Sequence, residues 1–232
     1  MIGLYDDRMN LTRAIKNIFF LLVAVFSGLT LVVITAAVSA GGGELSPFNS
    51  AIETAISLLR NPPLSSLMLL ITNIGSPFVL TSLSIILGVI LLSKNDTYDT
   101  LLYVFSMALS IVTFVIMKNA LSVPRPVDTM LMELTGWSFP SGHATVATAF
   151  FFVTGYSFFN WPKSWTLKIF LATLCVIGAL LVSFSRVYLG AHFAIDVLAG
   201  MALGLLTVSF SILVFNIFLS EREWWRRRVR SL

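Results

Sequence analysis

The chain has 232 residues, of which 57% are hydrophobic and only 11% are charged. Soluble domains carry about 25% charged residues, so this composition excludes an ordinary soluble protein and predicts a multi-pass membrane protein. The formal net charge is +4, and the C-terminal tail is basic. Membrane topology and anionic lipid explain that tail better than nucleic acid does, so we expect no nucleic-acid partner.

Six apolar stretches are candidates for membrane-spanning helices, each of which needs about 20 apolar residues. They cover about residues 17–40, 66–93, 100–117, 144–160, 165–185 and 193–219. Little chain remains outside them, so we expect an all-α fold, a six-transmembrane-helix bundle that residues 1–232 form as a single domain. Val38-Ser39-Ala40 loosely resembles a signal-peptidase site, but the apolar run before it is longer than a signal-peptide core, which favours an uncleaved first span.

The segment after the first span predicts a short helix on the membrane surface. Gly41-Gly42-Gly43 should end the first span, and Ser46-Pro47 is typical of a helix start. Apolar residues then recur at helical spacing, at Phe48, Ile52, Ala55, Ile56 and Leu59. We expect an amphipathic external helix that ends at Asn61-Pro62-Pro63. It would be either a lid near a lipid entrance or a simple connector at the interface.

The later spans contain a few local signals. Pro77 should kink the second span, where Asn73 either faces a site or bonds to a neighbouring helix. Gly200 and Gly204 in the sixth span permit close helix packing, within the chain rather than between two copies. Cys175 is the single cysteine and is interpreted as a packing residue. Trp224-Trp225 is typical of an interfacial anchor.

Basic residues assign a sidedness to the six spans. With a cytoplasmic N-terminus, eleven cations fall inside: Arg8, Arg13, Lys16, Lys94, Lys163, Lys168, Arg222, Arg226, Arg227, Arg228 and Arg230. Four fall outside: Arg60, Lys118, Arg125 and Arg186. This asymmetry follows the positive-inside rule and predicts cytoplasmic termini.

Three short stretches contain most of the ionisable chemistry of the apolar region. They are Lys118-x6-Arg125-Pro126, Pro140-Ser141-Gly142-His143 and Ser185-Arg186-x5-His192-x3-Asp196, and they include both histidines of the chain. Ionisable groups in membrane segments are costly and usually functional. With six spans, the loops that hold all three stretches fall on the same side, so we expect them to form one site on the outer face.

The residue types in these stretches point to a phosphate site. Lys118, Arg125 and Arg186 can neutralise phosphate charge, and the arginine fork matches two phosphate oxygens. Ser141 and Gly142 open a predicted helix, whose first N–H groups form an anion site that glycine lets a phosphate approach.

The two histidines supply the groups that phosphoryl transfer needs. His192 and Asp196 are four residues apart, so a helix places them on one face, where the carboxylate can fix the imidazole tautomer for nucleophilic attack. His143 remains as the proton donor for the leaving group. Asp128 and Glu133 are isolated, so we expect no metal site and no cofactor. Neutral His192 with protonated His143 predicts a bell-shaped pH profile, with inhibition by vanadate but not by chelators.

The three motifs, in this order, resemble the type 2 phosphatidic acid phosphatase (PAP2) superfamily. The motif block covers residues 118–196, and the six-span layout extends the likeness to the whole chain. The resemblance implies that His192 becomes a phosphohistidine, that Asp196 orients it, and that His143 is the general acid and later the base. It implies that Lys118, Arg125, Ser141, Gly142 and Arg186 bind phosphoryl oxygens, whereas Pro126, Pro140 and Ser185 are structural.

The resemblance also implies an integral membrane lipid phosphatase, and the compact length leads us to expect a bacterial inner membrane. The candidate substrates are undecaprenyl diphosphate, phosphatidylglycerol phosphate and phosphatidic acid, presented among membrane lipids. A phosphotransferase that uses another acceptor is the first alternative, because its first half-reaction is the same. A non-enzymatic anion channel or lipid-binding scaffold is a remote alternative, since neither needs a paired histidine and aspartate. The sequence does not predict the oligomeric state.

Overall fold

The computed structural model describes residues 2–42, 47–126, 136–159 and 161–218, and within those ranges every regular element is a helix. In chain order these are α1 (Ile2–Ala37), the π-helical turn η1 (Val38–Gly42), α2 (Pro47–Ser57), α3 (Pro62–Ile74), α4 (Pro77–Ser93), α5 (Thr97–Leu121), α6 (Gly142–Phe158), α7 (Trp165–Tyr188) and α8 (Ala194–Phe218). The predicted all-α fold is confirmed. Several predictions fall outside the described residues: those on Gly43, Ser46, Asp128, Glu133, Trp224, Trp225 and the tail arginines.

Among the described residues, four helices are long and apolar enough to cross a membrane: residues 14–41, α5, α7 and α8. Helices α3 and α4 would add a fifth span if the bent pair counts as one. Helix α6 has 17 residues and is shorter than these, but it packs against α4, α5, α7 and α8. A multi-pass membrane protein is therefore supported, whereas six spans remain a prediction.

The second predicted span is two helices rather than one kinked helix. Helices α3 and α4 meet at an angle of 46°. Ser76 caps α4, since its hydroxyl accepts a hydrogen bond from the Val79 amide at 3.3 Å, and Pro77 takes the first helical position, where proline needs no donor. Asn61 likewise caps α3 by accepting from the Leu64 amide at 3.0 Å. The prediction that Asn61-Pro62-Pro63 ends the preceding helix is therefore wrong, because α2 already ends at Ser57.

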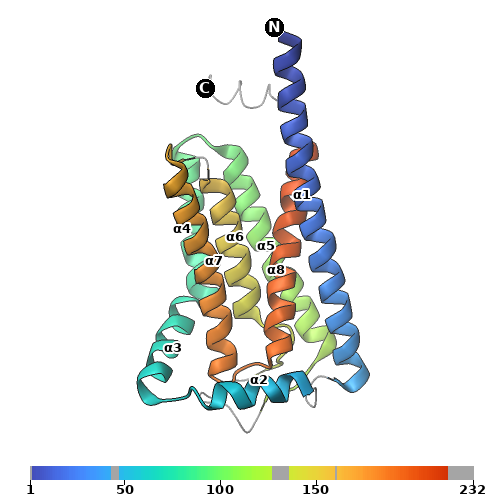
Figure 1. Cartoon of the computed structure of the whole chain (residues 1–232), viewed down its shortest axis with the longest axis vertical. Coiled ribbons are helices and arrows are strands. Elements are labelled where there is room, and N and C mark those ends of the chain that lie inside the picture. The colour runs from blue at the N-terminus through green and yellow to red at the C-terminus, as the bar shows by residue number, and fades with distance from the viewer. Residues whose placement is uncertain (1, 43–46, 127–135, 160, 219–232) are drawn as a thin grey trace.

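Helices α6 and α8 lie in the middle of the bundle, and α1 packs along α8 (Figure 1). The start of α1 and the end of α8 lie at one end of the bundle, and α2 lies across the other end (Figure 1). Gly41 has a φ of +82°, which takes the chain out of the first helix before α2. The described residues after α1 thus contain the predicted short helix, α2, at the bundle end, and its amphipathic character and external location remain predictions.

Close contact between α6 and α8 depends on the two glycines predicted to allow it. A Cβ on Gly200 would lie 2.6 Å from the Ser141 carbonyl oxygen, and one on Gly204 would lie 2.7 Å from the Thr145 carbonyl oxygen. Both approaches are closer than real Cβ atoms tolerate. The prediction of close packing within the chain is confirmed, and it sets α8 directly against the Pro-Ser-Gly-His turn.

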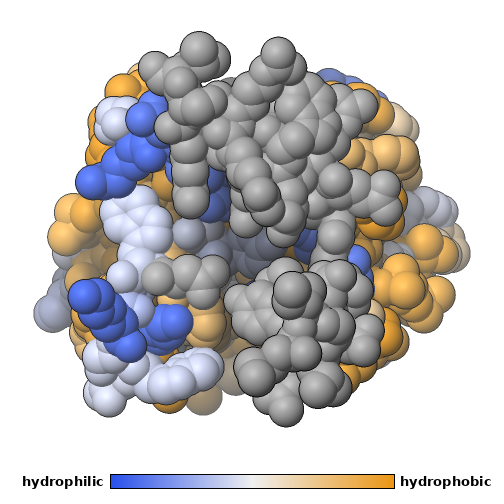
Figure 2. Space-filling view, turned by 90° about the horizontal axis from the view of Figure 1, so that it is seen from above, coloured by the Kyte–Doolittle hydropathy of each residue, from blue (hydrophilic) through white to orange (hydrophobic). Residues whose placement is uncertain are grey.

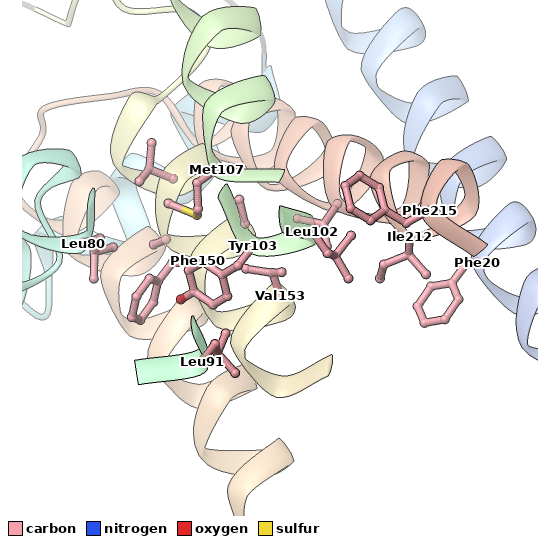
Figure 3. Close-up of a cluster of buried hydrophobic side chains, with 14 of the residues drawn as sticks. Phe20, Leu80, Leu91, Leu102, Tyr103, Met107, Phe150, Val153, Ile212 and Phe215 are labelled. Atoms are coloured by element: carbon pink, nitrogen blue, oxygen red, sulfur yellow. The ribbon is translucent and has the colours of Figure 1, made fainter. Parts of the chain in front are cut away.

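The buried apolar side chains of the described residues form three clusters, one of which includes Ile56 of α2 and Tyr188 of α7. The largest cluster lies towards the end of the bundle that is opposite α2. Ten of its side chains are labelled in Figure 3: Phe20, Leu80, Leu91, Leu102, Tyr103, Met107, Phe150, Val153, Ile212 and Phe215. The flanks of the bundle instead expose large apolar side chains, such as Phe26, Phe78 and Ile85. Viewed onto the end opposite α2, hydrophilic side chains gather on part of that end and hydrophobic ones surround it (Figure 2). This distribution fits a bundle whose sides face lipid.

Candidate active site

The structure brings the three predicted motifs to the bundle end that α2 covers. Lys118 lies in the last turn of α5 and Arg186 in the last turn of α7. His143 lies in the first turn of α6, and Asp196 in the first turn of α8. His143 lies close enough to interact electrostatically with four other side chains: Lys118, Arg125, Arg186 and His192. Helix ends that are distant in sequence therefore meet in one cluster.

The turn between α7 and α8 places His192 against the start of α8. Gly190 has a φ of +66°, a left-handed conformation that glycine adopts at helix C-termini without strain. The Ala191 amide donates back to the Arg186 carbonyl at 3.0 Å, which closes the turn. His192 is only 3% exposed as a result.

The two nitrogens of the His192 ring have different partners. Nδ1 lies 3.2 Å from the Ser138 hydroxyl and 3.5 Å from Asp196 Oδ2. Nε2 lies 3.2 Å from Arg125 Nη1, and arginine can only donate, so Nε2 accepts. The neutral ring therefore carries its proton on Nδ1 and directs the lone pair of Nε2 towards Arg125.

Arg125 is fixed by the backbone on both sides of the site. Its Nε donates to the Gly136 carbonyl at 3.0 Å, and its Nη1 donates to the Ala191 carbonyl at 2.8 Å. Burial lowers the pKa of this guanidinium. Burial, together with the positive charges of Arg125, Arg186 and Lys118, also lowers the pKa of His192 well below its ordinary value of 6.5. His192 is consequently neutral at neutral pH.

Arg186 approaches the same site from α7 and is 1% exposed. Its Nη1 donates to the Thr72 hydroxyl at 2.6 Å, and Thr72 is itself buried in α3. Lys118 is half-buried and interacts electrostatically with Arg125, Asp196 and Arg186. Three cations thus lie near one carboxylate, which leaves excess positive charge suited to an anion.

The start of α6 has a distinct geometry. The Ser141 hydroxyl caps the helix at Ala144, and the Ser141 amide donates to the Asp196 carbonyl at 3.1 Å, so this amide is already used within the protein. Gly142 is buried, with the Phe114 ring where a side chain would lie. The amides of Gly142 and His143 lie in the first helical turn, where no acceptor within the helix exists. These two amides are therefore the better anion donors.

Three polar residues that hold the site together lie outside the sequence motifs and were not predicted. Ser138 donates a short hydrogen bond to Asp196 Oδ2, and Thr72 holds Arg186. Asn49 of α2 accepts a hydrogen bond from the Ile195 amide at 3.3 Å, at the start of α8. Ser138 lies two residues before the Pro-Ser-Gly-His motif, and this proximity could have identified it as a site residue. Nothing local distinguishes Thr72 or Asn49 from other polar residues of membrane helices.

Across residues 2–42, 47–126, 136–159 and 161–218, no three His, Cys, Asp or Glu side chains are grouped as a metal site requires. The described acidic group of the site is Asp196, and its Oδ2 accepts from Ser138 and from the Phe193 amide at 3.1 Å. Metal independence stays a prediction.

Solved structures of other proteins share this fold. The chain is similar to a crystal structure of a transmembrane PAP2 type phosphatidylglycerolphosphate phosphatase from Bacillus subtilis, with a TM-score of 0.75 and 29% identity over 86% of this chain and 97% of that chain. The fold is thus that of a membrane phosphatase.

Sequence comparisons then establish the family. Residues 99–219 match the PAP2 superfamily. The chain is 33% identical to phosphatidylglycerophosphatase B of Bacillus subtilis over 68% of this chain and 78% of that protein. It is 30% identical to an undecaprenyl-diphosphatase of Sulfolobus acidocaldarius over 71% of this chain and 77% of that one. The chain belongs to the PAP2 superfamily, so the predicted family and the prediction of a phosphatase are confirmed.

Proposed function

We propose that the protein hydrolyses a phosphomonoester or diphosphate of a membrane lipid through a phosphohistidine at His192. The observation that carries the proposal is the His192 ring itself. Its Nδ1 is held by Ser138 and Asp196, while its Nε2 lies 3.2 Å from a guanidinium that can bind a phosphoryl oxygen. This arrangement supplies both a nucleophile and charge stabilisation where the phosphorus atom would lie.

The reaction would proceed in two displacements. Nε2 attacks phosphorus, the bond to the lipid oxygen or to the terminal bridging oxygen breaks, and His143 gives its proton to that oxygen. His143 then removes a proton from water, the hydroxide attacks phosphorus, and the N–P bond breaks. His192 returns to its neutral form, and inorganic phosphate leaves.

The phosphoryl oxygens would be bound by Lys118, Arg125, Arg186 and the first turn of α6, including Ser141 and Gly142. Arginine forks match two oxygens of a planar transition state, and buried donors are worth more than solvated ones. We propose that the reaction requires no metal ion.

The proposed location is a bacterial inner membrane, with the site on the outer face. Lys94, Lys163 and Lys168 belong to the turns and helix ends opposite α2, at the same end as the start of α1. Lys94 and Lys168 lie over aromatic rings there, 5.7 Å from the Trp161 ring centre and 5.1 Å from that of Phe159, as basic and aromatic residues at a membrane surface do. We propose cytoplasmic termini, six spans with α6 as the fourth, and a single domain over residues 1–232.

A lipid panel tests the function. Purified protein with chelator present would be given phosphatidylglycerol phosphate, undecaprenyl diphosphate, phosphatidic acid and a soluble sugar phosphate. The names of the relatives favour the first two lipids. We expect release of inorganic phosphate from at least one lipid, and inhibition by vanadate. Preference for the soluble ester would remove the lipid assignment, and appearance of the phosphoryl group on another acceptor without free phosphate would identify a phosphotransferase.

The pH profile follows from the state of His192. The neutral ring is the nucleophile, and its pKa is lowered below 6.5, so protonation removes activity only at pH values below that. On the alkaline side, activity falls as His143 loses the proton that it donates in the substrate complex, where the anionic phosphoryl group offsets the charge of the surrounding cations. We expect a bell-shaped dependence of kcat, which reports the substrate complex, measured with the best lipid of the panel and with the acid limb below the pH of an unperturbed histidine. A flat profile from about pH 5 to about pH 9 would contradict these roles.

Thr72 provides a test of the Arg186 contribution. Thr72→Val keeps the shape of the side chain but removes the acceptor 2.6 Å from Arg186 Nη1. A hydrogen bond to a charged group contributes about 1.5–3 kcal/mol, so we expect kcat/KM to fall roughly 10-fold or more. Thr72→Ser, which keeps the hydroxyl, is the matched control. Equal kinetics for the two variants would show that Thr72 does not position Arg186.

A further inference from the structure

Ser138 lies between the two members of the His192–Asp196 pair. Its hydroxyl is 3.2 Å from His192 Nδ1 and donates a short hydrogen bond to Asp196 Oδ2. The direct separation of Nδ1 and Oδ2 is 3.5 Å, which is longer than an ordinary N–H···O hydrogen bond. The carboxylate therefore reaches the imidazole mainly through the serine hydroxyl.

The donors and acceptors around this hydroxyl fix its direction. A serine has one proton to donate and lone pairs that accept. Asp196 Oδ2 can only accept when ionised, and it already receives the Phe193 amide at 3.1 Å. The Ser138 proton consequently points to Asp196, and a lone pair of its oxygen remains for the Nδ1–H of His192. Arg125 at Nε2 requires the same tautomer from the other side of the ring.

We propose that Ser138 is a positioning residue that holds His192 in the Nδ1–H tautomer by linking it to Asp196. This inference rests on the proposed function for its kinetic consequence, but the tautomer itself does not depend on turnover. Without the hydroxyl, His192 keeps its hydrogen bond to the Ser138 backbone, but Nδ1 faces the carboxylate at 3.5 Å. The ring is then held less firmly and can place its proton on Nε2, and a protonated Nε2 cannot attack phosphorus.

The backbone of Ser138 is held independently of its side chain. Its amide donates to the Val123 carbonyl at 2.7 Å, so the main chain keeps its anchor when the side chain is truncated. The side chain is fully buried, so no water replaces the hydroxyl without entering the core of the site. Ser138→Ala is therefore a local change that removes one donor and one acceptor.

The experiment combines spectroscopy with kinetics. The chain has only two histidines, so ¹⁵N-histidine labelling of the full-length protein gives two imidazole spin systems, and His143→Gln assigns them. We expect the wild type to show a protonated Nδ1 and an unprotonated Nε2 at His192. In Ser138→Ala we expect mixed tautomers, and kcat with the best lipid of the panel lower by about 10- to 100-fold with KM changed much less.

Three further variants separate positioning from a general loss of structure. Ser211 is equally buried and donates only to the Thr207 carbonyl of its own helix, at 2.7 Å, so Ser211→Ala should leave tautomer and kcat unchanged. Ser138→Thr keeps the hydroxyl and should restore both readouts. If Ser138→Ala does not fold, Ser138→Cys provides the test, because a thiol has nearly the same shape but accepts weakly.

The outcomes distinguish the inference from the proposed function. An unchanged His192 tautomer and an unchanged kcat in Ser138→Ala, in an active protein, would overturn the inference alone. A wild-type protein that releases no phosphate from any lipid would overturn the proposed function, while the ¹⁵N spectra would still decide the tautomer.

Discussion

The His192→Ala variant is expected to lose phosphate release by about 10⁴-fold or more, because the proposed covalent step has no other nucleophile. The pathway would end before any phosphoenzyme forms. Rapid quenching with a radiolabelled substrate should therefore trap an acid-labile phosphohistidine in the wild type and none in the variant. Both should be measured on folded protein, because the buried ring also contributes packing.

His143→Ala is the matched control, since it removes the other histidine. An aryl phosphate has a leaving group that needs no proton, so this variant should still form the phosphohistidine from it. Hydrolysis should then be slow, because no base activates water, and the phosphoenzyme should accumulate. A phosphoenzyme in His192→Ala, or none in either variant, would contradict the assignment of the nucleophile.

Gly200→Ala is expected to destabilise the protein and to disturb the site together. The added Cβ would lie 2.6 Å from the Ser141 carbonyl oxygen and 3.1 Å from the Ala144 Cβ, so α8 must move away from α6. Overpacking of this kind costs about 1–3 kcal/mol. Because Ser141 and Asp196 are hydrogen-bonded across the same contact, kcat should fall as well. Thermal unfolding in detergent and phosphate release measure the two effects.

Gly28→Ala is the control for helix propensity. A Cβ at Gly28 would meet only the Leu206 Cδ1 atom at 3.7 Å, an ordinary contact. Alanine is favoured over glycine in a helix by up to about 1 kcal/mol, so this variant should be neutral or more stable. If Gly200→Ala melted at the same temperature as Gly28→Ala, the close approach would not constrain the bundle.

Prediction from sequence succeeded where a local signal was strong. The long apolar runs of α5, α7 and α8 predict helices because a backbone in lipid must satisfy its own hydrogen bonds. The order of the three motifs along the chain is sufficient to identify the PAP2 superfamily. The helix boundaries between residues 61 and 77 were predicted less accurately. An Asn-Pro or Ser-Pro pair is equally compatible with the end of one helix and with the start of the next. The structure uses both pairs as starts, at Pro62 and Pro77.

The sequence alone determined the class of fold, the residue types of the site and their arrangement on helix ends. Hydropathy and the i, i+4 spacing of His192 and Asp196 are local properties, and local properties can be read along a chain. The packing of the helices places Ser138 between the members of that pair, Thr72 against Arg186, and Arg125 against Nε2. Each of these contacts joins residues more than 50 positions apart, at distances of 3.2 Å or less, so they depend on how the helices pack.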